Sequence, residues 1–318
     1  MPTLSPATTA FVFPGQGSQA AGMGRELAQA SAAARQVWAE ADAALGFALS
    51  QLCWEGPEAE LNATVNTQPA LLACSIAALR AAQEKLGDFQ PAYLAGHSVG
   101  EVTALVAGGA LSFADGVRLV RARGEAMAAA GQRAPGAMAA ILNLDALALA
   151  EVCAEASAQT GGIVQVANDN CPGQVVISGD VPTLEKAMEL AKARGAKRAV
   201  KLAVSVAAHS PLMQSGVADY AAAVEAVSFQ MPRAPVISNL TALPLPDVEA
   251  IRAELPAQLT GPVRWTESVR YLVTQGVTTF VELGSKDVLT GLLKRIDGGV
   301  TGLALGTPEA VESLEVRS

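Results

Sequence analysis

One serine of the chain stands in a pattern that could do nucleophilic chemistry. Gly96, Ser98 and Gly100 form a G-x-S-x-G sequence between the apolar segment "AYLAG" and a helical pattern. A strand that turns sharply into a helix exposes the serine hydroxyl, and the helix N-terminus favours the negative charge that develops in acyl transfer. A bare G-x-S-x-G sequence also fits the cap of an ordinary helix, but the flanking strand and helix favour a nucleophile.

A serine hydroxyl needs a base to react at neutral pH, and the chain has two histidines, His97 and His209. His97 is adjacent to Ser98, and neighbouring side chains in a tight turn point apart. His209 lies at the end of the strand-like "KLAVSV" and precedes Ser210 and Pro211, which suit a helix cap and a first helical position. His209 is the favoured base, and a histidine satisfied by local hydrogen bonds is the alternative.

An arginine gives a third clue. In the helix expected over residues 112–130 and expected to stop at Gly131, Arg123 shares one side with the apolar Leu119 and Val120. An arginine on a face that should be buried needs a partner. The partner is either an acidic residue in a structural ion pair or the carboxylate of a ligand held through two hydrogen bonds. The helical pattern alone favours the ion pair.

The elements that must position these side chains are alternating strands and helices. A strand at residues 9–13 leads through "PGQGSQ" into helical sequence from Gly24 to Leu45, and residues 66–87 predict a helix with Pro69 in its first turn. From His209 onward the alternation resumes, which predicts a parallel α/β domain.

The middle of the chain has a different order of elements. Residues 137–203 read as strand, helix, strand, strand, helix and strand, which is the ferredoxin-like βαββαβ pattern. We therefore expect an α/β fold with two domains. The larger, parallel-sheet and α/β-hydrolase-like, comprises residues 1–131 and 204–318. The small ferredoxin-like domain comprises residues 132–203 and is inserted in it.

Composition limits the class of protein. The chain has 318 residues, of which 51% are hydrophobic, and a net charge of −8. This charge gives no reason to bind nucleic acid or an anionic membrane. Neither a signal-peptide pattern nor an apolar run of about 18 residues occurs, so we expect a cytoplasmic protein. Four scattered cysteines without C-x-x-C spacing predict neither a disulfide framework nor a metal site.

Several motifs together resemble the malonyl-CoA:acyl carrier protein transacylase family. They run from residue 10 to residue 297 and are more specific than G-x-S-x-G: "FVFPGQGSQ", "AGHSVGE", "LVRARGEAM", "GAMAAI", "NDNCPGQVVISG", "KLAVSVAAHSPLM", "QLTGPVRW" and "VLTGLLKRI". The resemblance implies an enzyme without a cofactor. It would transfer the malonyl group of malonyl-CoA, through a serine ester, to the phosphopantetheine thiol of acyl carrier protein in fatty acid biosynthesis.

The resemblance also implies roles for single residues. Ser98 would be the acylated nucleophile and His209 its general base, oriented by the backbone carbonyl of Gln258. Arg123 would bind the malonyl carboxylate. If Gln258 contributes only its backbone, replacing it by alanine should do limited harm.

Further roles follow in the same way. The backbone N–H groups of Gln16 and Val99 would form the oxyanion hole. The other predicted substrate-binding residues are His97, Asn168 and Asn239.

The acyl carrier proteins that such enzymes meet are acidic, so a local basic patch is expected. The densest basic run is residues 192–201, whose alternative interpretation is a solvated helix end. Lys286, Lys294 and Arg295 form a second candidate patch.

Other functions fit less well. An α/β-hydrolase esterase would need an HGGG-type loop and an acid between Ser98 and a histidine near the C-terminus, and we find neither. A non-catalytic module that binds a carrier protein would not need Ser98, His209 and Arg123 together. A polyketide-type or decarboxylase-associated malonyl acyltransferase is the nearest alternative.

Overall fold

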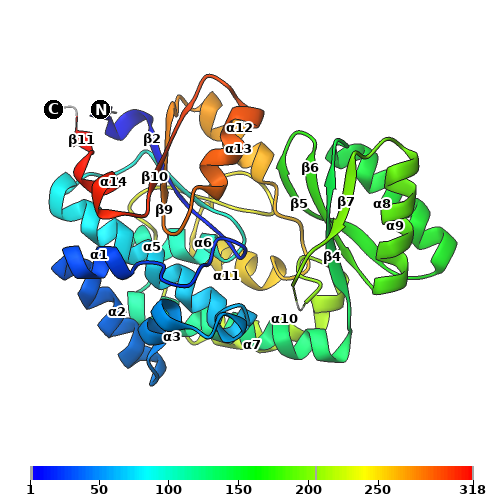
Figure 1. Cartoon of the computed structure of the whole chain (residues 1–318), viewed down its shortest axis with the longest axis horizontal. Coiled ribbons are helices and arrows are strands. Elements are labelled where there is room, and N and C mark those ends of the chain that lie inside the picture. Colours follow the sequence, from blue (N-terminus) through cyan, green and yellow to red (C-terminus); the bar gives the residue numbers. More distant parts are fainter. Residues whose placement is uncertain (1–2, 205, 317–318) are drawn as a thin grey trace.

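The protein is built on two main β-sheets, which a computed structural model describes for residues 3–204 and 206–316 (Figure 1). Residues 1, 2, 205, 317 and 318 lie outside the described part. The larger sheet has five parallel strands in the order β10-β9-β2-β3-β8. These strands are β2 (Thr9–Phe13), β3 (Tyr93–Gly96), β8 (Val236–Ile237), β9 (Thr279–Leu283) and β10 (Thr301–Leu305).

Helices surround this sheet, as expected for a parallel sheet. Near the site lie α5 (Thr64–Leu86), α6 (Gly100–Ala107), α7 (Phe113–Arg133), α11 (Val248–Ala257), α12 (Trp265–Thr274) and α13 (Val288–Ile296). The others are α1 (Arg25–Ala30), α2 (Ala32–Leu45), α3 (Leu49–Glu55), α4 (Glu58–Leu61), α10 (Gln214–Glu225) and α14 (Pro308–Glu312), with short 3₁₀ helices at Pro6–Thr8 and Pro211–Met213. Beside the two termini, β1 (Thr3–Leu4) pairs in parallel with β11 (Glu315–Val316) (Figure 1).

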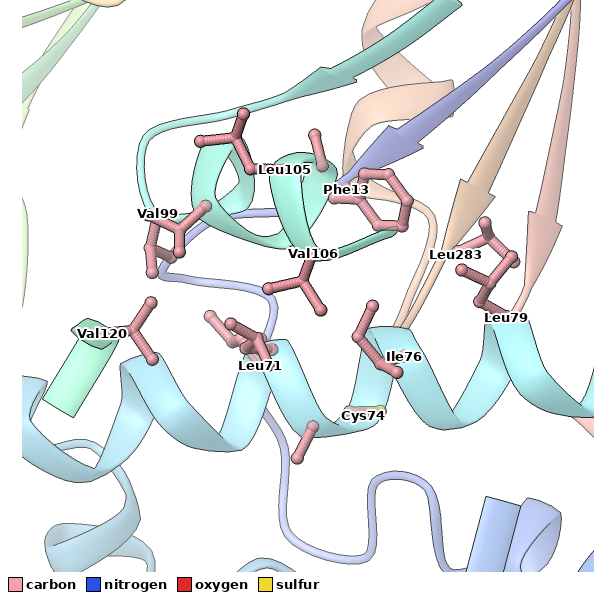
Figure 2. Packing of buried hydrophobic residues seen from close by; sticks show 14 of the residues in the cluster. Phe13, Leu71, Cys74, Ile76, Leu79, Val99, Leu105, Val106, Val120 and Leu283 are labelled. Carbon is pink, nitrogen blue, oxygen red and sulfur yellow. The ribbon is translucent and has the colours of Figure 1, made fainter. Parts of the chain in front are cut away.

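Strand β2 shows why the larger sheet is covered on both faces. All of its residues are buried, and successive side chains point to opposite faces. Phe11 and Phe13 belong to the core that α5 and α6 complete, and Figure 2 shows Phe13 and Leu283 facing this helix pair. Val12 packs instead into a second cluster with residues of α12 and α13, such as Leu272. The carboxyl ends of β2 and β3 therefore meet at one edge, where the loops that follow them can form a site.

The smaller sheet is antiparallel, in the order β5-β6-β4-β7, and lies to one side of the larger one (Figure 1). Its strands and the two helices between them follow in the order β4 (Ala137–Leu142), α8 (Ala146–Thr160), β5 (Val164–Cys171), β6 (Gln174–Gly179), α9 (Val181–Ala193) and β7 (Arg198–Lys201). Residues Ala139 and Ile141 of β4 pack against α8 and α9. Met138 and Ala140 point the other way. The α/β class, with one parallel and one antiparallel sheet, is confirmed.

Two predicted helix boundaries are wrong. Helix α7 continues through Gly131 to Arg133, because one glycine costs a helix only about 1 kcal/mol. It ends where Pro135 disfavours helical backbone at Ala134. The domain limit at residue 131, which lies within α7, stays a prediction. Helix α5 begins at Thr64, which places Pro69 beyond the first turn.

The helical sequence from Gly24 to Leu45 forms two helices, because Ser31 ends α1 and caps α2. The Ser31 hydroxyl accepts a hydrogen bond from the backbone N–H of Ala34. Across residues 3–204 and 206–316, no helix is both long and apolar enough to cross a bilayer.

Candidate active site

Ser98 occupies a sharp turn between β3 and α6, with a positive φ of 54°. Non-glycine residues seldom adopt this conformation. The two glycines of the motif allow it. A Cβ atom on Gly96 would lie 1.9 Å from the backbone of Gly100, and one on Gly100 would lie 2.2 Å from the carbonyl oxygen of Phe13. The G-x-S-x-G spacing is therefore a steric requirement of the turn.

His209 is in hydrogen-bond contact with this serine. The distance from Ser98 Oγ to His209 Nε2 is 2.8 Å. His209 Nδ1 lies 2.9 Å from the carbonyl oxygen of Gln258 and 3.0 Å from that of Gly261. Because carbonyl oxygens only accept hydrogen bonds, Nδ1 carries the proton and Nε2 is free to accept the serine proton. The dyad is oriented by backbone carbonyls, and no carboxylate of the described residues has that role.

The position of His209 in the chain differs from the prediction. The strand β7 ends at Lys201, and the following residues up to His209 have no strand conformation where the structure describes them. Ser205, within the segment "KLAVSV", lies outside the described residues. His209 itself has a φ of 58°. Pro211 is the first residue of a 3₁₀ helix and Ser210 directly precedes it, as the types of these two residues predict. An irregular segment and not a strand end therefore presents the base.

Electrostatics keep this base neutral. Only 2% of His209 is exposed. Burial, and next the charge of Arg123, lower the pKa of His209 to about 3. Both effects disfavour a second proton on the ring. The imidazole is therefore ready to accept a proton at neutral pH.

Arg123 reaches the same serine from helix α7. Its Nη1 donates to Gln68 Oε1 at 2.9 Å, and its Nη2 donates to Gln258 Oε1 at 2.7 Å and to Ser98 Oγ at 3.1 Å. Its side chain is buried, with 2% of the residue exposed. Within the described ranges no acidic side chain forms an ion pair with it.

The structural ion pair that the helical pattern favours is therefore wrong. Amide oxygens accept hydrogen bonds from both Nη atoms of Arg123 without neutralising its charge, and its buried Nε–H has no acceptor among the described residues. The charge remains available to an anion that enters the site.

Two glutamine side chains were missed from the sequence. Gln258 uses its side chain as well as its backbone, because Oε1 accepts from Arg123 and Nε2 donates to Ser98 O at 3.2 Å. The premise that only its carbonyl matters is thus wrong. Gln68, the other partner of Arg123, is a polar residue on an almost wholly buried helix, α5. That contrast is the signal that could have identified it.

Gln16 and Val99 line the cavity above Ser98. Among the residues that are described, no hydrogen bond uses the backbone N–H of either. The Gln16 side chain is held by Thr64, whose hydroxyl donates to Gln16 Oε1 at 3.0 Å. Two unused donors beside the nucleophile are what an oxyanion hole requires.

The cavity has a volume of about 390 Å³ and lies between the two sheets. Ser98, Arg123 and His209 line it from the larger part, and Met138, Ala140, Asn168, Asn170 and Val176 line it from the smaller sheet.

The three remaining predicted residues take different positions. His97 lines the cavity, and its Nε2 lies 2.8 Å from Asn170 Oδ1. Asn168 also lines it and is 6% exposed. Asn239 is not among the lining residues. It accepts from the N–H of Ser98 and donates to the carbonyl of Gly96, each at 2.7 Å, and so braces the turn.

The described ranges contain no group of three or more His, Cys, Asp or Glu side chains that could hold a metal ion.

Known proteins resemble the chain along most of its length. The acyl transferase domain family matches residues 10–296. Malonyl CoA-acyl carrier protein transacylase of Bacillus subtilis (strain 168) is 46% identical over 303 residues, 95% of either chain. Its namesake from Escherichia coli (strain K12) is 46% identical over 95% of this chain and 97% of its own.

Solved structures agree with these relatives. An acyl carrier protein S-malonyltransferase from Vibrio cholerae O1 biovar eltor superposes with a TM-score of 0.92, at 43% identity over 96% of this chain and 99% of that one. A malonyl-transacylase solved in complex with a type II PKS acyl-carrier protein gives a TM-score of 0.93, at 44% identity over 96% and 98%. This chain belongs to the malonyl-CoA:acyl carrier protein transacylase family of acyltransferases.

Proposed function

We propose that this enzyme transfers the malonyl group of malonyl-CoA to the phosphopantetheine thiol of acyl carrier protein, in fatty acid biosynthesis, through an ester on Ser98. The observation that carries the proposal is the buried guanidinium of Arg123, which has no acidic partner among the described residues and lies 3.1 Å from Ser98 Oγ. A carboxylate on the acyl group would supply the missing negative charge and bind in bidentate fashion.

The first half-reaction acylates the serine. Ser98 Oγ attacks the thioester carbonyl carbon while His209 Nε2 takes the hydroxyl proton. The backbone N–H groups of Gln16 and Val99 hold the oxyanion of the tetrahedral intermediate. The carbon–sulfur bond then breaks, CoA leaves as the thiol with the proton from His209, and the malonyl ester remains on Ser98.

The second half-reaction reverses these roles. The phosphopantetheine thiol gives its proton to His209 and attacks the ester carbonyl carbon. The carbon–oxygen bond to Ser98 breaks, and His209 returns the proton to the serine oxygen. Arg123 holds the malonyl carboxylate through both steps, so that the carbonyl stays above the nucleophile.

The polar groups at the edge of the cavity fit the rest of the substrate. Asn168 and His97 line the cavity, so we assign them to substrate binding. We assign Asn239 a supporting role, because its two bonds go to the turn that carries Ser98.

The test is the intact mass of the protein after mixing with malonyl-CoA, acetyl-CoA and methylmalonyl-CoA in turn. We expect one malonyl group on the parent protein and none on Ser98→Ala. Peptide mapping should locate the label on Ser98. Label on a cysteine, or release of free malonate without transfer to a carrier thiol, would contradict the proposal.

A polyketide carrier is the second candidate acceptor, because one similar structure is a malonyl-transacylase in complex with a type II PKS acyl-carrier protein. The chemistry at Ser98 is the same for both carriers. The ratio of kcat/KM for a fatty acid carrier and a polyketide carrier separates the two pathways.

We further infer that the two sheets mark two domains, residues 1–131 with 204–318 and residues 132–203. The first resembles α/β-hydrolases, and the element order β4, α8, β5, β6, α9, β7 of the second supports a ferredoxin-like domain. A cooperative melt of the isolated smaller segment would support this division.

A further inference from the structure

Two acidic side chains are buried beside the turn that carries Ser98, and the reaction described above uses neither. Glu101 lies in the first turn of α6 and is fully buried, and Glu254 in α11 is 6% exposed. Their carboxyl groups lie close enough to interact with each other. In the described part of the chain neither forms an ion pair with a basic residue.

The hydrogen bonds around the pair show which carboxyl group holds a proton. Two carboxylates in contact cannot both be ionised in a buried site. Glu254 Oε1 accepts the backbone N–H of Leu240 at 3.0 Å, and Ser238 also stabilises its charge, whereas the backbone of Asn239 acts on both carboxyl groups. Donors that surround a carboxylate stabilise its charge, so the negative charge belongs on Glu254 and the proton on Glu101.

The two oxygens of Glu101 have different surroundings. Oε2 accepts a hydrogen bond from Gln258 Nε2. Oε1 is buried and finds no donor among the described residues. An oxygen without a donor is the natural place for the proton, since an O–H group there can donate to the carboxylate of Glu254. Burial and the adjacent Glu254 charge also raise the pKa of Glu101 well above its usual value.

This arrangement fixes the amide of Gln258 in one orientation. Nε2 must face an acceptor, and Glu101 Oε2 and the carbonyl of Ser98 provide two. Oε1 is thereby turned toward Arg123 Nη2 at 2.7 Å. A reversed amide would set N–H donors against the guanidinium and lose a charge-assisted hydrogen bond.

We propose that Glu101, sharing a proton with Glu254, is a positioning residue for Arg123 that acts through the amide of Gln258 and sets the preference for acyl groups that carry a carboxylate. The inference rests on the proposed function, in which Arg123 binds the malonyl carboxylate. Glu101 touches neither substrate nor reacting atoms, so its effect must pass through Gln258.

The experiment compares kcat/KM for malonyl and acetyl transfer in Glu101→Gln, Glu101→Met and the parent enzyme. A glutamine can accept from Gln258 and donate to Glu254, so Glu101→Gln should keep malonyl transfer within about threefold. Methionine offers no acceptor, so Glu101→Met should lower malonyl transfer about tenfold or more, with a smaller loss for acetyl transfer. Combined with Gln258→Leu, Glu101→Met should add little, because both changes break one pathway.

Two controls keep the result decisive. Glu101→Met leaves a buried charge on Glu254 and is liable to misfold, so the double variant Glu101→Met/Glu254→Met repeats the comparison with both carboxyls removed. Arg123→Ala in parallel tests the proposed function itself, which fails if that variant keeps its malonyl preference. If Arg123→Ala loses the preference, three outcomes overturn the inference alone: equal damage by Glu101→Gln and Glu101→Met, parallel losses of malonyl and acetyl transfer, or additive effects with Gln258→Leu.

Discussion

The two walls of the cavity contribute different kinds of side chain. The wall from the larger part holds Ser98, His209 and Arg123, which are polar, largely buried and each tied by at least two hydrogen bonds. The wall from the antiparallel sheet carries no charged side chain and combines apolar residues such as Met138 and Val176 with amides such as Asn168, all from regular strands. One wall therefore carries the chemistry, and the other limits the shape of what enters.

Charge in the cavity is also handled differently from charge on the surface, where both parts have exposed ion pairs. In the smaller part Arg194 pairs with Glu151 and Glu155, and Lys201 pairs with Glu185, all at the surface. Such exposed pairs contribute about 0–1 kcal/mol to stability. Arg123 has only amide and hydroxyl partners in the described chain and keeps its charge for a ligand. Substitutions on the two sides should accordingly have effects of very different size.

The largest effect should come from the base on the chemical wall. His209→Ala removes the group that accepts the Ser98 proton, and general-base assistance contributes about 10²–10⁴ in rate. We expect acyl-enzyme formation to slow by at least that factor in stopped-flow measurements, while the melting temperature changes little. Near-normal transfer by this variant would mean that the chemistry does not depend on the dyad.

Arg123→Ala should produce the next largest effect, and a selective one. It deletes a charge-assisted contact with the malonyl carboxylate, at a cost of about 2–5 kcal/mol in transition-state binding. Acetyl-CoA has no carboxylate, so acetyl transfer should persist or improve. The two kcat/KM values and a thermal melt provide the measurement. A parallel fall of both rates with a lower melting temperature would indicate a structural role for this arginine.

The pH dependence should be displaced from that of an ordinary histidine. Because burial and the Arg123 charge lower the pKa of His209 to about 3, the base stays unprotonated as pH falls through 6.5, the usual value for histidine. We expect kcat/KM for acetyl transfer to show no acid limb between about pH 5 and 8. Removing the charge in Arg123→Ala should move the limb upward. A midpoint near 6.5 in the parent enzyme would refute this account of the base.

The sequence identifies the reacting residues because each breaks a local pattern. Ser98 stands between two glycines at a strand-to-helix turn, and Arg123 interrupts an apolar helix face. Nothing in the local sequence links their partners to them, even where a partner such as Gln68 stands out on a buried helix. Gln68 and Gln258 are separated from Arg123 by 55 and 135 residues, and only the folded chain brings them to it. The local pattern therefore favours an ion pair that the fold does not make.

The same distinction holds for the elements. The strand "AMAAIL" is β4 as predicted, because a short run of apolar residues is visible in the local sequence. The predicted end of α7 is wrong because the loss of helix stability at Gly131 is small compared with the packing energy of a long helix, of which ten residues are buried. The segment before His209 was expected to be a strand from its β-branched and apolar residues, but strand conformation also needs a partner strand, and β7 pairs only as far as Lys201.

The smallest effect should come from surface lysines, and it should show which of the two parts binds an acidic carrier protein. Lys294 and Lys197 are both exposed, and each change to alanine removes one positive charge. Lys294 lies in the last turn of α13, where its neighbour Arg295 donates to Gln174, a residue that lines the cavity. None of residues 192–201, all of them described, lines it.

A carrier protein must deliver its thiol into the cavity, so a positive charge close to the cavity-lining residues should contribute more to carrier binding than one far from them. Lys294→Ala should raise KM for the carrier roughly twofold to fivefold and reduce its dependence on salt. Lys197→Ala should leave both about unchanged, and neither variant should alter acylation by malonyl-CoA, which needs no carrier. Kinetics at two ionic strengths provide the measurement. A larger effect of Lys197→Ala than of Lys294→Ala would place the carrier-binding surface on the antiparallel part, which would then bind the carrier as well as limit the shape of the substrate.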